Sequence, residues 1–203
     1  MPFRIVPIVE GHGEVEAVPI LFNRLIIEFD LGVQIGIARP IRQPKGSLIK
    51  EGGLERAVQL AAIEGGDSGA VFVLMDSDGD CPRSRAPELL ARARNARPDR
   101  RISVVLAHHE YEAWFLASAS SLQGHCRLSD DILDHPTPEE VRDCKGWLEA
   151  WMPRTSKYSE TADQAAMTAL FDFKLALRAP SFEKLYRDFR GACKEARTVQ
   201  EPS

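Results

Sequence analysis

The sequence Val-Glu-Gly-His-Gly-Glu at residues 9–14 comes directly after residues 3–9, an apolar run with the character of a buried strand. A second acidic cluster, Asp-Ser-Asp-Gly-Asp at residues 76–80, follows another such run at residues 70–75. If the two runs are parallel strands of one sheet, both clusters lie at the edge where open α/β sheets bind ligands. Carboxylates that converge there repel one another unless a cation neutralises them, and oxygen ligands suit Mg²⁺ or Mn²⁺. The sequence therefore predicts a divalent-metal site.

Strand-like and helix-like segments alternate through the first part of the chain. We expect strands at about 3–9, 33–41, 70–75 and 102–107, and helices at about 14–29, 53–63, 86–96 and 112–118. This order predicts an α/β fold with a mainly parallel sheet of about four strands flanked by helices. After residue 124 we expect only helices, near 138–151, 161–170 and 181–196. The predicted organisation is an α/β core, residues 1–123, with a C-terminal helical extension, residues 124–203, packed on it.

Composition limits the class of protein. The chain has 203 residues, of which 44% are hydrophobic, and this suits a single domain with an ordinary core. No apolar run approaches the ~18 residues of a membrane span, and the first residues lack the pattern of a signal peptide. The four cysteines are scattered without a CxxC pair, which argues against a zinc ribbon or a disulfide framework. We expect a cytoplasmic protein without a membrane partner, and a homodimer is compatible with the sequence.

Basic residues are concentrated in two stretches although the net charge is −4. Residues 39–50 contain four basic residues and no acid, and residues 83–101 are rich in arginine. One interpretation is a solvated helix face. The other is a track for a phosphate backbone beside the metal, in which the contacting residues would be Arg92, Arg94 and Arg97.

Glu10 and Glu14 are the first two candidate metal ligands. Glu10 ends a strand and precedes Gly11 and Gly13, which allow the backbone to approach a ligand closely. Glu14 lies at the start of the following helix. There it serves either as a metal ligand or as an acid favoured by the helix dipole.

The cluster at 76–80 has three interpretations. It is a surface turn rich in Asp and Gly, the nucleophile loop of a haloacid-dehalogenase-like phosphatase with Asp76 as nucleophile, or a metal-binding pair formed by Asp76 and Asp78. We prefer the metal pair, because residues two apart on a strand face the same way. Asp80 is then expected outside the first ring of ligands. An EF-hand is excluded, since the glycine falls at the fourth place of the loop and not the sixth.

Two further segments contain candidate site residues. Glu110 and Glu112 follow the strand at 102–107, and within a helix they would diverge by about 200°, so only one, taken as Glu112, is expected to reach the metal. Glu110 is placed further out. Lys157 belongs to a polar group with Tyr158, Asp163 and Gln164, and it either binds a phosphate or lies in a helix cap region. His108 and His109 lack a partner histidine at metal-like spacing, and we expect structural roles for them.

These motifs resemble the Toprim superfamily. Its pattern is a Glu after the first strand in a Val-Glu-Gly-like context and an Asp-x-Asp after the third strand, matched here by Glu10 and by Asp76 with Asp78. The Glu-Gly-x-x-Glu form resembles the Toprim domains of OLD-family nucleases (overcoming lysogenization defect). Most of the chain resembles an uncharacterised family of small stand-alone bacterial Toprim-like proteins. The residues that carry this resemblance are the run at 109–113 and, later in the chain, Tyr158, Asp163, Gln164, Ser181 and Phe182.

The resemblance implies Mg²⁺- or Mn²⁺-dependent cleavage of phosphodiesters in nucleic acid, in phage defence or repair. Glu10 would be a general acid/base or ligand, Asp76 and Asp78 would bind metal, and Glu14 with Glu112 could serve a second metal. OLD-type proteins carry an ATPase domain, but this chain has no Walker motif, so an ATPase would have to be a separate partner. The alternatives are an aspartate-nucleophile phosphatase and a non-catalytic subunit of an ATPase-linked system.

Overall fold

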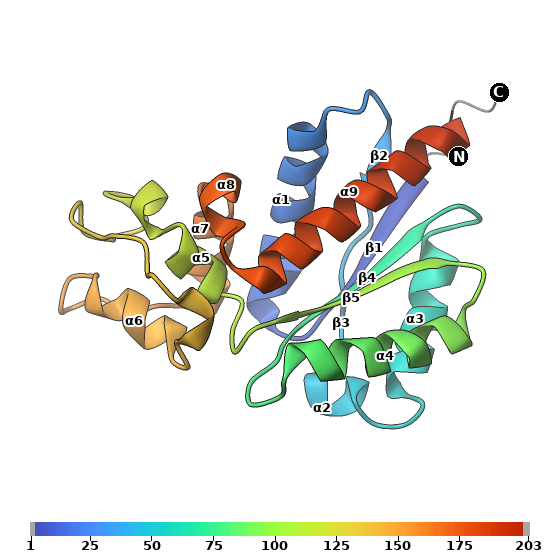
Figure 1. Ribbon diagram of the computed structural model, residues 1–203, viewed down its shortest axis with the longest axis horizontal. Helices are drawn as coiled ribbons and strands as arrows, with labels where there is room; N and C mark the ends of the chain where they lie inside the picture. Colours follow the sequence, from blue (N-terminus) through green and yellow to red (C-terminus); the bar gives the residue numbers. More distant parts are fainter. Residues whose placement is uncertain (1–2, 201–203) are drawn as a thin grey trace.

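A parallel β-sheet forms the centre of the computed structural model, which describes residues 3–200 (Figure 1). The strands are β1 (Phe3–Val9), β2 (Ile35–Ile37), β3 (Ile41–Arg42), β4 (Ala70–Asp76) and β5 (Arg101–Ala107). Their order is β2-β1-β4-β5, with β3 also beside β1, and every pair is parallel. The predicted α/β class with a mainly parallel sheet is confirmed, with five strands in place of about four.

The additional strand arises because the segment predicted as one strand at 33–41 is interrupted. β2 pairs with the start of β1 and β3 with its end, and Pro40 lies between them. Opposite this gap β1 contains Pro7, which has no amide hydrogen to donate to a ladder. Both prolines therefore fall where the pairing stops, and the strand divides in two.

Helices cover both faces of the sheet (Figure 1). α1 (His12–Phe29) and α9 (Pro180–Gln200) lie on one face, and α2 (Lys45–Leu48), α3 (Gly53–Glu64) and α4 (Pro82–Ala96) lie on the other. Strand residues alternate between the two hydrophobic clusters: Phe72 packs with α1 and α9, whereas Val71 and Val73 pack with α3 and α4. This alternation is the period of two expected of strands buried on both sides.

The helical part of the chain lies beyond the carboxyl ends of the strands (Figure 1). It contains α5 (Ala113–Ala117), η1 (Ala119–Leu122), η2 (Pro138–Glu140), α6 (Cys144–Ala150), the π-helical turn η3 (Glu160–Gln164), α7 (Ala165–Thr168) and α8 (Phe173–Ala176). The helix predicted at 138–151 is in fact two short helices, because Asp143 caps α6 by accepting a hydrogen bond from the Gly146 amide at 2.8 Å. The helix predicted at 161–170 begins as a π-turn, and α2 and α8 were not predicted.

Aromatic packing holds α9 on the sheet, and a hydrogen bond joins α9 to the helical part. Phe189 of α9 lies 5.4 Å from Phe72 of β4 and 4.7 Å from Phe22 of α1, measured between ring centroids. Near the carboxyl ends of the strands, Trp114 donates a hydrogen bond from Nε1 to Ser181 Oγ at 2.8 Å. These contacts fix the helices over the edge of the sheet that carries the candidate site. Among residues 3–200, none of the helices is long and apolar enough to span a membrane.

Candidate active site at the carboxyl edge of the sheet

Three carboxylates lie where three neighbouring strands end. Glu10 follows β1 directly, Asp76 is the last residue of β4, and Glu112 comes shortly after β5. Asp76 pairs in register with Ala107, the last residue of β5, and β1 is the other neighbour of β4. Parallel pairing therefore places Glu10, Asp76 and Glu112 at the same edge of the sheet.

Glu112 is fully buried, and only half of its carboxylate is satisfied. Its Oε1 accepts hydrogen bonds from Tyr158 Oη at 2.7 Å and from Gln164 Nε2 at 3.2 Å. Its Oε2 is buried without a hydrogen-bond partner, and Glu10 Oε2 is in the same condition. A buried carboxylate oxygen without a partner is costly, so these two atoms indicate a group that completes the site.

The pKa values of these acids are raised. Asp76 accepts a hydrogen bond from the Tyr111 amide at 2.8 Å, yet burial, followed by the charges of Glu112 and Glu14, holds its pKa well above the ordinary 3.8. Burial likewise raises the pKa of Glu112 to about 7, although Lys145 and the Tyr158 hydroxyl act against the shift. Crowded, buried carboxylates of this kind favour either protons or a cation.

Glu14 has a structural role in addition to its place near the site. It is buried in the first turn of α1, and the amide of Gly11 at the helix N-cap contacts its carboxylate. This resembles the return of an acidic side chain to the N-cap in a capping box. Burial, followed by the charge of Glu160, raises the Glu14 pKa. The contacts support the interpretation of Glu14 as an acid at the helix N-terminus, and its role as a metal ligand stays a prediction.

Lys145, which the sequence did not single out, supplies positive charge to the site. Its Nζ lies 2.6 Å from Glu160 Oε1 and 3.7 Å from Glu110 Oε1. Burial opposes its charged form, but the carboxylate of Glu112 and the hydrogen bond to Glu160 raise the Lys145 pKa nonetheless. Lys157, the predicted phosphate-binding lysine, is exposed, and its backbone carbonyl is what accepts a hydrogen bond, from Arg127. No short motif marks Lys145, so sequence reasoning had no signal for it.

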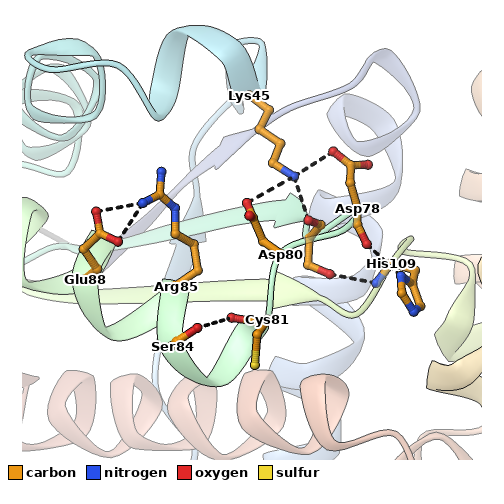
Figure 2. Close-up of polar contacts among 9 residues, drawn as sticks. Lys45, Asp78, Asp80, Cys81, Ser84, Arg85, Glu88 and His109 are labelled. Atoms are coloured by element: carbon orange, nitrogen blue, oxygen red, sulfur yellow. Dashed lines mark hydrogen bonds and ion pairs between the residues drawn. The ribbon is translucent and has the colours of Figure 1, made fainter.

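A second, more exposed group surrounds Lys45 at the start of α2. Figure 2 shows its ammonium directed at Asp78 and Asp80, with Asp78 Oδ2 2.7 Å away and Asp80 Oδ2 4.0 Å away. The ammonium also donates a hydrogen bond to the carbonyl of Ser77 at 2.9 Å. Asp78 has φ of 52° and an exposed side chain, so β4 does not continue through it. The expected strand-like alignment of Asp76 with Asp78 is therefore wrong, because the chain turns after Asp76 and Asp78 pairs with Lys45.

Glu10 lies within electrostatic reach of both groups. Burial raises its pKa most, and the charges of Asp78 and Glu14 add to this effect. Lys45 and the nearby backbone amide of Asp76 act in the opposite direction. The charges of the Lys45–Asp78 pair and of the buried carboxylate of Glu14 therefore both act on Glu10.

The remaining candidates near the strand ends stabilise loops. Glu110 Oε2 accepts hydrogen bonds from the amides of Cys144 at 2.9 Å and Lys145 at 3.3 Å, and so stabilises the start of α6. His109 Nδ1 lies 2.7 Å from the Asp78 carbonyl (Figure 2). The His109 amide donates a hydrogen bond to Ser77 Oγ at 2.8 Å. These contacts hold the loop after β4 against the loop after β5.

The arginines proposed as a phosphate track are largely engaged within the protein. Arg92 pairs with Glu55 at 2.8 Å and donates hydrogen bonds to the carbonyls of Ile49 and Lys50. Arg97 pairs with Asp99 at 2.7 Å, close to the start of β5 and hence to the edge of the sheet opposite Asp76. Arg94 is exposed. The contacts favour a structural role for Arg92 and the solvated-face interpretation for Arg97.

The donor set fits a hard divalent cation, although the ligands are not all gathered. Within residues 3–200, no three His, Cys, Asp or Glu side chains already form a group that could hold a metal ion. The unpartnered buried atoms nevertheless include carboxylate oxygens of Glu10 and Glu112, and the charges of both residues act on Asp76. Oxygen atoms alone suit Mg²⁺ or Mn²⁺.

Comparison with known proteins places this arrangement in a family. The model of a family described as a domain of unknown function, DUF4276, matches residues 9–190. Neither the curated proteins nor the solved structures contain a match. The matched range includes Glu10, Asp76 and Glu112, the strands from β2 to β5 and the helical part; it begins at the last residue of β1. The chain belongs to the DUF4276 family.

Proposed function

We propose that this protein is a Mg²⁺- or Mn²⁺-dependent nuclease of the Toprim type that hydrolyses phosphodiesters of nucleic acid. The observation that carries the proposal is the pair of buried, unpartnered carboxylate oxygens on Glu10 and Glu112, which follow β1 and β5, the strands on either side of β4. The raised pKa values of Asp76 and Glu112 support it, since a divalent cation relieves the same crowding that burial creates.

In this proposal Glu10, Asp76 and Glu112 hold the cation, with Glu14 beside them. The cation would supply Lewis-acid activation and a bound water of lowered pKa. Glu10, which Lys45 and the Asp76 amide partly stabilise as the anion, accepts the proton of the attacking water. Lys45 and Lys145, at the exposed and buried sides of the carboxylates, offset negative charge where a phosphate would enter.

The proposed partner is nucleic acid, and a separate ATPase is a second candidate partner, since residues 1–203 contain no Walker motif. We place the activity in the cytoplasm, in a defence or repair system. The four cysteines are free, which agrees with a reducing compartment.

The test measures cleavage of end-labelled single- and double-stranded DNA and RNA with Mg²⁺, with Mn²⁺ and with EDTA. Glu10→Gln keeps the size of the side chain but removes its charge and proton transfer, so cleavage should fall by on the order of 10²-fold or more. Glu16→Gln, an exposed neighbour on the outer face of α1, is the matched control and should cleave like the wild type.

Two outcomes would overturn the proposal. Near-wild-type cleavage by Glu10→Gln would remove Glu10 from the chemistry. A phosphorylated Asp76 detected by mass spectrometry would instead identify an aspartate-nucleophile phosphatase. If the protein alone cleaves none of the substrates but binds an ATPase in a pull-down, the non-catalytic subunit hypothesis takes its place.

A further inference from the structure

Gln164, from the helical part of the chain, carries a third unpartnered oxygen in the same region. The side chain is 3% exposed, and its Oε1 is buried without a hydrogen-bond partner. Its Nε2 donates a hydrogen bond to Glu112 Oε1 at 3.2 Å. Two hydrogen-bonded side chains, Gln164 and Glu112, therefore each retain one free oxygen in a buried place.

The orientation of the Gln164 amide is determined by its partner. Glu112 Oε1 already accepts a hydrogen bond from the Tyr158 hydroxyl, and a carboxylate oxygen only accepts. Turning the amide over would place Gln164 Oε1 against Glu112 Oε1, oxygen against oxygen. Nε2 consequently faces Glu112, and Oε1 remains the free acceptor.

The local backbone is adapted to bring Gln164 to this place. Gln164 ends η3, a π-helical turn, and such turns are frequently found at functional sites. η3 packs closely on Gly13 at the start of α1: a Cβ on Gly13 would collide with Gln164 Oε1 and would lie 2.8 Å from the Glu160 carbonyl. The glycine after Glu10 and the turn that ends in Gln164 therefore fit together.

We infer that Gln164 Oε1 is a neutral ligand of the divalent cation, bound together with the free Glu112 Oε2. The inference rests on the proposed metal site and adds a ligand from the helical part of the chain. A neutral oxygen is well suited to this position, because Glu10, Asp76 and Glu112 already bring negative charge that Lys145 only partly offsets. An amide oxygen adds coordination without adding repulsion, and amide carbonyls are ordinary ligands of hard cations.

The experiment measures Mn²⁺ binding to the full-length protein by isothermal titration calorimetry and by electron paramagnetic resonance of free Mn²⁺. Gln164→Leu removes the ligand oxygen and should weaken binding by on the order of 10-fold or more, because even the loss of a hydrogen-bond partner of a ligand costs about that much. Tyr158→Phe is the matched control. It removes the other donor to Glu112 Oε1 but leaves both free oxygens in place, so its loss should be several times smaller.

Gln164→Glu separates ligation from positioning. It restores an oxygen at the same reach but cannot donate to Glu112. If Gln164 is a ligand, Gln164→Glu should bind Mn²⁺ more tightly than Gln164→Leu does, with an affinity equal to or above that of the wild type. If Gln164 only orients Glu112, Gln164→Glu should bind as poorly as Gln164→Leu, and that result would overturn the inference.

Equal losses for Gln164→Leu and Tyr158→Phe would also overturn it. Metal-free melting curves and circular dichroism confirm that each variant is folded before titration. Titration of the wild type distinguishes failure of the proposed function from failure of this inference. If the wild type binds no Mn²⁺, the metal-dependent nuclease proposal and this inference both fail. If the wild type binds Mn²⁺ and Gln164→Leu binds it equally well, the assignment of Gln164 alone fails.

Discussion

Tyr158 donates a hydrogen bond to Glu112 at 2.7 Å, and this contact links the helical part of the chain to the loop that follows β5. The tyrosine stabilises one carboxylate oxygen and leaves the other without a partner. Burial raises the pKa of the Tyr158 hydroxyl, and the neighbouring charge of Glu112 adds to the shift, so the hydroxyl keeps its proton and remains a donor. The ionisation of Glu112 thus depends on residues distant in sequence.

Glu112 should make the metal-free protein less stable as the pH rises. Its folded-state pKa of about 7 is above the ordinary 4.5, so the folded state holds this proton more tightly than the unfolded state does. The stabilisation is complete below about pH 4.5 and is lost as the pH rises through about 7. Glu112→Gln, which stays neutral, should gain stability relative to the wild type between pH 5 and pH 8, by on the order of 2 kcal/mol.

Urea denaturation in EDTA at the two pH values measures this gain, with Glu16→Gln as the exposed control. A difference between Glu112→Gln and wild type that is the same at both pH values would show that Glu112 does not titrate in this range.

Mg²⁺ or Mn²⁺ should raise the melting temperature, and EDTA should reverse the rise. A cation that binds only the folded state at 100 times its Kd adds about 2.7 kcal/mol, which for a chain of this size is about 5–10 °C. The rise should be larger at pH 8 than at pH 6, because metal must displace the protons that raised pKa values retain on Asp76 and Glu112. Differential scanning fluorimetry measures it, and Glu10→Gln should show a smaller rise. No shift at millimolar Mg²⁺ or Mn²⁺ would contradict the metal site.

Arg92 should matter for stability, whereas Arg94 should not. Arg92 joins α4 to Glu55 of α3 and to the carbonyls that follow α2, so Arg92→Ala removes its hydrogen bonds to three groups, of which the Lys50 carbonyl keeps the Gly53 amide as a donor. We expect a loss of about 1–3 kcal/mol in the free energy of unfolding. Arg94→Ala on the same helix is the control and should melt like the wild type, because Arg94 is exposed. Equal melting temperatures for the two variants would leave Arg92 available for a phosphate.

Gly13→Ala should destabilise the protein and weaken cation binding together. The added methyl group would collide with Gln164, and forcing an atom into a packed place costs about 1–3 kcal/mol. Gly46→Ala in α2 is the matched control, because a Cβ there meets nothing within 4 Å. Alanine is the better helix former, so Gly46→Ala should be neutral or slightly stabilising. Thermal melts and Mn²⁺ titration of both variants test this; a stable Gly13→Ala protein with full affinity would contradict it.

The sequence was sufficient to predict the sheet and the acids that end its central strands. Apolar runs of strand length, separated by helical patterns, specify a parallel sheet, and parallel pairing places Glu10 and Asp76 at one edge. The division of the second predicted strand was not foreseen, since it depends on Pro7 and Pro40 both falling where the pairing of neighbouring strands is interrupted.

The partners of the site residues were harder to predict. The turn at Asp78 depends on its left-handed backbone, and Lys45 reaches Asp78 only because β3 runs beside β1. Lys145 approaches the carboxylates through the packing of α6, and Gln164 through a π-turn. Such contacts form between segments that are remote in sequence, and no local pattern records them.

The wide separation of Glu10 and Gln164 along the chain affects the order of events during synthesis. β1 and β4 can pair once about the first hundred residues have left the ribosome, because domains fold as units during synthesis. Two contacts form only after the C-terminal third of the chain has been synthesised: the hydrogen bond between Gln164 and Glu112, and the packing of η3 on Gly13. A nascent or broken chain that ends before η3 therefore has strands but an incomplete site. For a protein proposed to cut nucleic acid, this would keep an unfinished polypeptide inactive while it is still next to the messenger RNA that encodes it.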